Sequence, residues 1–217
     1  MTQAKFETMR HAMVASQLRT SAVTDPGVVA AMGQVARERF VPDSRAELAY
    51  IDRRVPLGGG RALNPPLSTG LLLTAIAPRA GDKILVIGAA TGYAAALLGE
   101  IGAAVIALEE DVDLAGFAER ALIGHAHVAT VRAPLAEGWA RGGPYDAIVI
   151  DGAVPQVPEA IAAQLKDGGR FATALIERGV TRLAAGRKTG ALLALADFTD
   201  ADAVALPGFD LPKSFVF

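Results

Sequence analysis

The stretch Lys83-Ile84-Leu85-Val86-Ile87-Gly88-Ala89-Ala90-Thr91-Gly92-Tyr93 decides the fold of this chain. Its first five residues form an aliphatic run between two glycines, which is typical of a strand buried in a parallel sheet. A short loop framed by Gly88 and Gly92 follows, and the residues from Tyr93 to Ile101 are expected to form a helix. A strand, a tight loop and a helix in this order predict one βα unit.

The alternation of aliphatic runs and helical segments continues beyond this unit. Further strands are expected at residues 104–108, 127–131, 146–150 and 170–175, with two more at 180–187 and 192–198. Helices are expected at residues 112–122 and 157–165, the second one ended by Gly168-Gly169 as a C-cap. Repeated βαβ units predict an α/β fold with a doubly wound, mostly parallel sheet.

The first 80 residues have a different texture, helical and rich in loops. Helices are expected at residues 4–18, from Pro26 to about Val35 with Asp25 as the N-cap, and at 67–76. Gly58-Gly59-Gly60 is expected to be a flexible joint. We therefore divide the chain into an N-terminal helical lid at residues 1–80 and a cofactor-binding core at residues 81–217, packed as one compact unit.

Composition limits the classes of protein to which the chain can belong. It has 217 residues, is 52% hydrophobic and contains no cysteine, so disulfides, thiol nucleophiles and cysteine-ligated metals are excluded. Two histidines, His125 and His127, lie two apart but lack a third ligand, so no metal site is expected. No apolar stretch reaches the roughly 18 residues of a membrane span, and no signal peptide is recognisable, so a cytoplasmic location without a membrane partner is expected.

Charge is unevenly distributed along the chain. The net charge is -2, which gives no sign of a nucleic-acid partner. Residues 1–80 hold 10 Lys and Arg against 6 Asp and Glu, a balance of +4, and the remainder holds 11 against 17, a balance of -6. An acidic partner would meet the first segment more readily, although a chance excess of solvated arginines explains the bias equally well.

The loop after the first strand carries the pattern of a cofactor site. In doubly wound sheets ligands bind at the carboxyl ends of the strands, where glycine lets a ligand approach the backbone. Glu109 ends the next strand, where a carboxylate can accept both hydroxyls of an adenosine ribose. The alternative is a purely structural turn. The proposed cofactor-binding residues of the loop are Gly88, Ala89, Ala90, Thr91 and Gly92.

The glycine spacing favours S-adenosylmethionine (SAM) over a dinucleotide. The dinucleotide pattern GxGxxG would need glycine at Ala90 and at Tyr93, whereas the GxGxG pattern of SAM enzymes fails only at Ala90. A P-loop is excluded, because the chain contains no G-x-x-x-x-G-K-[ST].

Motifs outside this loop carry a resemblance to a known family. In chain order they are Gln17-Leu18-Arg19, Thr24-Asp25-Pro26, Arg39-Phe40-Val41-Pro42, Ala49-Tyr50-x-Asp52, Pro56-x-Gly58, Gly88 to Tyr93 with Ala95-Ala96, Glu109, Pro144-Tyr145-Asp146-Ala147-Ile148, Ala153-x-Pro155-x-Val157-Pro158 and Gln164-Leu165-Lys166-x-Gly168-Gly169. From about Met13 to Gly169 the chain resembles the protein-L-isoaspartate O-methyltransferases.

The resemblance implies a SAM-methyltransferase-like Rossmann fold and a repair function. Such enzymes transfer a methyl group from SAM to an isoaspartyl carboxylate of a damaged protein, leaving S-adenosyl-L-homocysteine. The ester closes to a succinimide, which reopens partly as aspartate. In the segment that matches the family's active-site loop, the amide donors of Asn64 and the charge of Arg61 are expected to meet the substrate carboxylate, together with the Gly58–Gly60 joint. Leu135 stands where the family places residues near the adenine. Asp151 is expected either to face the cofactor pocket or to cap a turn.

The chain departs from the family pattern around the expected site. Asn64 and Ala62 stand where the family has serine and threonine, and Val86 and Pro134 replace two acidic residues. Three alternatives therefore stay open: a SAM-binding or scaffold protein that keeps the fold with little or no activity, a methyltransferase with another carboxylate substrate, and, as a distant third, an NAD-dependent oxidoreductase. The oligomeric state is not predictable from the sequence.

Overall fold

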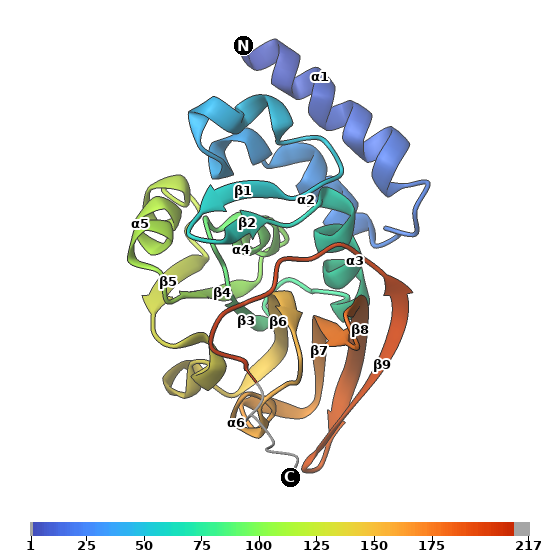
Figure 1. Ribbon diagram of the computed structural model, residues 1–217, viewed down its shortest axis with the longest axis vertical. Helices are drawn as coiled ribbons and strands as arrows, with labels where there is room; N and C mark the ends of the chain where they lie inside the picture. The colour runs from blue at the N-terminus through green and yellow to red at the C-terminus, as the bar shows by residue number, and fades with distance from the viewer. Residues whose placement is uncertain (1, 211–217) are drawn as a thin grey trace.

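The computed structural model describes residues 2–210 and contains a central sheet of seven strands (Figure 1). The strand order is β5-β4-β3-β6-β7-β8-β9, in which β3 to β7 are parallel and β8 and β9 are antiparallel. The fold class predicted from the sequence is confirmed. The strand bounds are β3 Lys83–Ile87, β4 Ala104–Glu109, β5 Val128–Arg132, β6 Tyr145–Val154, β7 Leu165–Glu177, β8 Val180–Thr189 and β9 Leu192–Asp200.

Alternate side chains of β3 enter two apolar clusters on opposite faces of the sheet. Ile84 and Val86 belong to one cluster and Leu85 and Ile87 to the other, and all four are fully buried. This arrangement follows from the two-residue period of a strand, and it explains why the run is aliphatic throughout. Helices α3 (Pro66–Ile76), α4 (Tyr93–Glu100) and α5 (Val112–Ala121) contribute to the first cluster.

The strand order reverses between β3 and β6. From β3 the chain proceeds outward through β4 to β5 and then returns to pair β6 with the other side of β3. The carboxyl end of β3, with the loop at residues 88–92, therefore lies at the switch point of the sheet, the usual ligand site of such folds.

The N-terminal segment lies over the carboxyl ends of the central strands (Figure 1). Helix α1 (Gln3–Met13) continues into a π-helical turn at Val14–Leu18, and α2 (Pro26–Gln34) is capped by Asp25, which accepts from Val28 N at 3.0 Å. Met13 and Met32 share one apolar cluster with the strand residues Ile84 and Val86. The N-terminal segment thus shares an apolar core with the sheet.

Two expectations about local structure are wrong. Gly58-Gly59-Gly60 is not a flexible joint but the turn of a hairpin between β1 (Val55–Gly58) and β2 (Arg61–Leu63), and all three glycines have positive φ. The helix expected at residues 157–165 is only the single turn α6 (Glu159–Ala162). Pro158 begins it, and Leu165 already pairs with Tyr145 in the sheet, so Gly168-Gly169 lies inside β7 and caps no helix.

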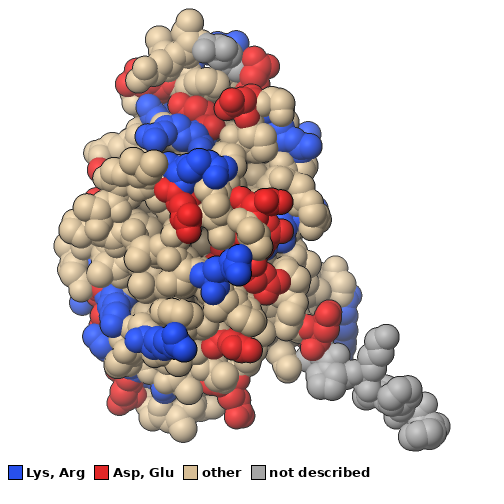
Figure 2. All heavy atoms as spheres, turned by 90° about the vertical axis from the view of Figure 1, so that its left-hand side faces the viewer, with Lys and Arg blue, Asp and Glu red and all other residues tan. Residues whose placement is uncertain are grey.

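Surface features agree with a mixed-charge protein. On the face shown in Figure 2, basic and acidic side chains lie interspersed. Among residues 2–210, the helices are all too short or too polar to cross a membrane.

Candidate active site

The loop at residues 88–92 has the backbone of a ligand-binding turn. Gly88 and Gly92 have φ of 72° and 97°, a region that favours glycine, and Gly92 N donates to Ala89 O at 2.8 Å. Thr91 Oγ1 donates to Phe40 O at 2.6 Å, so the hydroxyl ties the loop to the N-terminal segment. All five loop residues are buried.

Ala90 adopts a left-handed conformation that alanine disfavours. Its φ is 50°, at the position where the GxGxG pattern has its middle glycine. A left-handed residue other than glycine costs about 1–2 kcal/mol, whereas glycine loses about 0.5–1 kcal/mol in backbone entropy.

We expect Ala90→Gly to raise the free energy of unfolding by up to about 1 kcal/mol, because the relief of strain exceeds the added entropy. Urea unfolding followed by circular dichroism measures the change. Ala89→Gly is the matched control, since Ala89 has no positive φ and should lose about 0.5–1 kcal/mol. Equal destabilisation by both substitutions would contradict the strain at Ala90.

Glu109 lies at the end of β4, beside this loop. Its carboxylate accepts from Ala90 N at 2.8 Å, from Glu110 N at 3.0 Å and from Asp111 N at 3.1 Å. The residue is only 1% exposed. The strand end thus places a buried carboxylate next to the loop, as the sequence predicted, and its role toward a ribose stays a prediction.

Arg61 occupies both oxygens of this carboxylate. Its Nη1 lies 2.7 Å from Glu109 Oε1 and its Nη2 lies 2.8 Å from Oε2, a bidentate pair with both side chains buried. Arg61 comes from β2, directly after the glycine turn. The structure therefore brings Arg61 to the proposed ribose carboxylate, whereas the sequence analysis expected its charge to meet the substrate carboxylate.

Asn64 links two distant segments through its side-chain amide. Its Nδ2 donates to Asp151 Oδ1 at 2.8 Å and to Asp151 O at 2.9 Å, and its Oδ1 accepts from Val204 N at 2.8 Å. Asp151 lies within β6, which extends beyond the expected strand end at Ile150, and it caps no turn. Burial raises the pKa of Asp151, an effect opposed by the Asn64 hydrogen bond and by the charges of Arg37 and Arg61.

Arg37 is a buried charge that the sequence analysis did not single out. Its Nε donates to Ala49 O at 2.7 Å, its Nη2 donates to Asn64 O, and its guanidinium lies 4.5 Å from the ring centroid of Tyr93. Burial lowers the pKa of Arg37. Arg37 directly precedes Glu38 and the Arg39-Phe40 motif, and nothing in the local pattern distinguishes it from a surface arginine.

Leu135 lies in the second apolar cluster with Leu108 and Leu206. It is fully buried, and its N donates to Glu110 Oε2 at 3.1 Å. Its proposed contact with an adenine stays a prediction.

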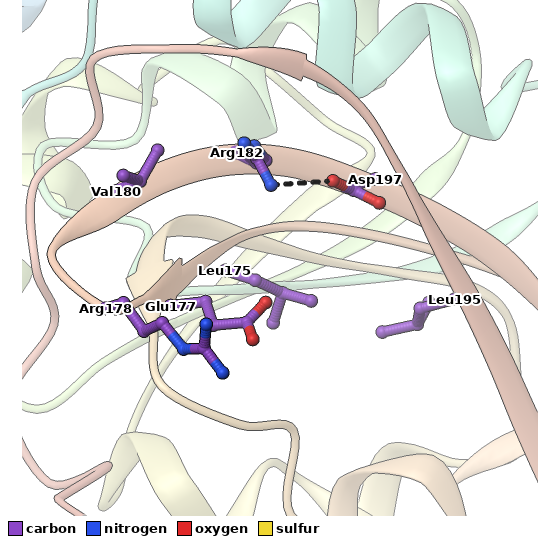
Figure 3. A pocket seen from close by; sticks show the side chains of 7 residues that line it. All are labelled: Leu175, Glu177, Arg178, Val180, Arg182, Leu195 and Asp197. Atoms are coloured by element: carbon purple, nitrogen blue, oxygen red, sulfur yellow. Dashed lines mark hydrogen bonds and ion pairs between the residues drawn. The ribbon is translucent and has the colours of Figure 1, made fainter.

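One cavity of the described residues lies away from these side chains. The one in Figure 3, of about 340 Å³, surrounds the turn between β7 and β8 and is lined by Leu175, Glu177, Arg178, Val180, Arg182, Leu195 and Asp197. Arg182 and Asp197 form an ion pair across it, with Nη1 3.4 Å from Oδ2. This cavity shares no residue with the loop or with Glu109.

Comparisons with known proteins agree on one family. A family model described as Protein-L-isoaspartate(D-aspartate) O-methyltransferase matches residues 8–198. A protein-L-isoaspartate O-methyltransferase of Rhodopseudomonas palustris is 42% identical over 161 residues, which cover 73% of this chain and 74% of the relative. A protein of the same name from Methylorubrum extorquens is 41% identical over 165 residues, with coverages of 75% and 72%.

Solved structures share the fold. A chain named protein-L-isoaspartate O-methyltransferase superposes with a TM-score of 0.79 at 22% identity, and the match covers 94% of this chain and 66% of that one. A putative enzyme of this kind from Plasmodium falciparum, in complex with S-adenosyl-L-homocysteine, gives a TM-score of 0.78 at 19% identity, with coverages of 91% and 97%.

Proposed function

Since the chain belongs to the protein-L-isoaspartate O-methyltransferase family, we propose that it transfers a methyl group from SAM to the carboxylate of isoaspartyl residues in damaged proteins. The observation that carries this proposal is the buried Glu109, 2.8 Å from a loop amide at the switch point of the sheet. This carboxylate and the loop at residues 88–92 support the binding of an adenosine. A cytoplasmic location remains a prediction from the sequence.

The chemistry asks little of the protein. SAM supplies an activated methyl group, and a carboxylate is already a nucleophile, so no base is needed. The side chains of this chain would align the two groups and exclude water. We propose that Arg61 and Asn64 do this for the acceptor carboxylate, with charge-assisted and amide hydrogen bonds.

Two contacts in this arrangement oppose the proposed cofactor site. Arg61 saturates Glu109, and the Leu206 side chain lies 2.7 Å from where a Cβ on Gly88 would stand. This observation favours a second candidate, a family member that keeps the fold and serves as a binding or scaffold protein. The two candidates are distinguished by activity, because only the methyltransferase transfers a methyl group from SAM to an isoaspartyl peptide.

We expect wild-type protein to transfer labelled methyl groups from SAM to an isoaspartyl peptide slowly, but at least about tenfold faster than to the same peptide with normal aspartate. A tenfold ratio corresponds to about 1.4 kcal/mol of barrier. Base-labile methyl ester is measured for both peptides. Transfer to neither peptide, with S-adenosyl-L-homocysteine still bound, would replace the repair function by the binding protein.

A further inference from the structure

Residues 201–209 form a strap that follows β9 and crosses the ends of the central strands. Figure 1 shows the segment in dark red, running from the end of β9 back over β6. Four of its side chains are buried, those of Ala203, Val204, Leu206 and Phe209. The strap therefore runs along the surface with these four side chains packed inward.

Backbone and side-chain hydrogen bonds fasten the strap. Ala153 N donates to Val204 O at 2.7 Å, and Leu206 N donates to Ala153 O at 3.0 Å, so the strap adds a short parallel bridge to the end of β6. Val204 N donates to Asn64 Oδ1, and Ser68 Oγ donates to Asp202 O at 2.8 Å. Asn64 thus joins the strap, β6 and the loop after β2.

Leu206 fills the space over Gly88 in the loop and over Gly152 in β6. A Cβ added at Gly88 would stand 2.7 Å from Leu206 Cδ1, and one added at Gly152 would stand 2.5 Å from Leu206 Cγ. Gly88 opens the loop at the switch point of the sheet, where a ligand would approach the backbone. Leu206 belongs to the same apolar cluster as Leu135, the residue expected near an adenine.

From these contacts we infer that the strap is an intramolecular occupant of the cofactor site, and that SAM and the strap compete for it. The inference rests on the proposed function, because it takes SAM as the ligand. Binding requires Leu206 to leave Gly88 and Arg61 to leave Glu109. The apparent affinity is then the intrinsic affinity reduced by the fraction of molecules whose strap is undocked.

The competition is tested with the full chain and S-adenosyl-L-homocysteine. Leu206→Ser removes an apolar side chain from the docked strap and leaves the walls of the pocket unchanged, so we expect its affinity by calorimetry to rise ten- to a hundredfold. The matched control is Leu192→Ser, since Leu192 on β9 is 68% exposed. The control should bind within about twofold of wild type.

Hydrogen exchange tests the same inference without a substitution. Saturating S-adenosyl-L-homocysteine should speed the exchange of the Val204 and Leu206 amides of wild-type protein at least tenfold, because their acceptors Asn64 Oδ1 and Ala153 O are released. A ligand that binds without moving the strap would slow them or leave them unchanged. Amides within β8 serve as the internal reference.

The outcomes separate this inference from the proposed function. Equal affinities of wild type and Leu206→Ser, with strap amides still protected in the complex, would overturn the competition and leave SAM binding intact. Failure of every variant to bind S-adenosyl-L-homocysteine, combined with absent methyl transfer, would overturn the proposed function and the competition together.

Discussion

Glu109→Gln should lower the free energy of unfolding by about 3–5 kcal/mol, the usual loss when one partner of a buried ion pair is removed. The substitution leaves Arg61, 5% exposed, with a buried charge and no carboxylate. It also replaces the acceptor of three backbone amides by a neutral group. Urea unfolding measures the loss.

A double-mutant cycle assigns the loss to the pair. Arg61→Met with Glu109→Gln should lose at least about 2 kcal/mol less than the two single substitutions summed, because neither charge is then stranded. Asp197→Asn, which breaks a half-exposed pair with Arg182, should change stability by less than about 1 kcal/mol. Additive losses at Arg61 and Glu109 would show that the two side chains are not coupled in solution.

The tyrosines of native protein should not ionise near pH 10, their ordinary pKa. The chain has three, and burial raises the pKa of each: Tyr145 to about 12, and Tyr50 and Tyr93 upward as well. Glu38, which accepts the Tyr50 hydroxyl, raises the pKa of Tyr50 further.

Stability therefore falls at alkaline pH. A pKa raised in the folded state gives stability that is complete below pH 10 and is lost as the pH rises toward 12. For Tyr145 the pKa rises to about 12, so its contribution to stability is lost between pH 10 and pH 12. We expect phenolate absorbance to appear together with the loss of circular dichroism.

Tyr145→Phe provides the control for this titration. It removes the hydroxyl that donates to Trp139 O at 2.6 Å and should make unfolding less steeply dependent on pH above 10. A phenolate signal with a midpoint near pH 10 in protein that keeps its native circular dichroism would contradict the burial of these side chains.

Strands and helices with strong local patterns were predictable. The aliphatic run at residues 83–87, the Asp25 cap and the antiparallel strands after residue 177 appear where the sequence predicts them. Gly58-Gly59-Gly60 misled the prediction, since three glycines suit both a joint and a tight turn, and only the pairing of Val55 with Leu63 decides between them. The prediction of a helix over residues 157–165 was wrong because Leu165 pairs in the sheet with Tyr145, 20 residues earlier in the chain.

The sequence predicted where the candidate site residues lie in the sheet, but it did not predict which side chains contact them. The loop and Glu109 could be placed because each follows a strand of the same parallel sheet. The Arg61–Glu109 pair joins residues 48 apart, and the Asn64–Val204 contact joins residues 140 apart. Neither contact produces a repeating pattern of residues in the sequence, and the sequence of the strap indicates only a loop.

The 140-residue separation between Asn64 and Val204 has a consequence for biosynthesis. A ribosome adds about 5–20 residues per second, so Val204 is synthesised about 7–28 seconds after Asn64, the residue that binds it. The loop at residues 88–92 and the β3–β4 pair are made within that interval, before the segment that covers them exists. A nascent chain thus passes through a stage in which the loop at residues 88–92 lacks the contact of Gly88 with Leu206.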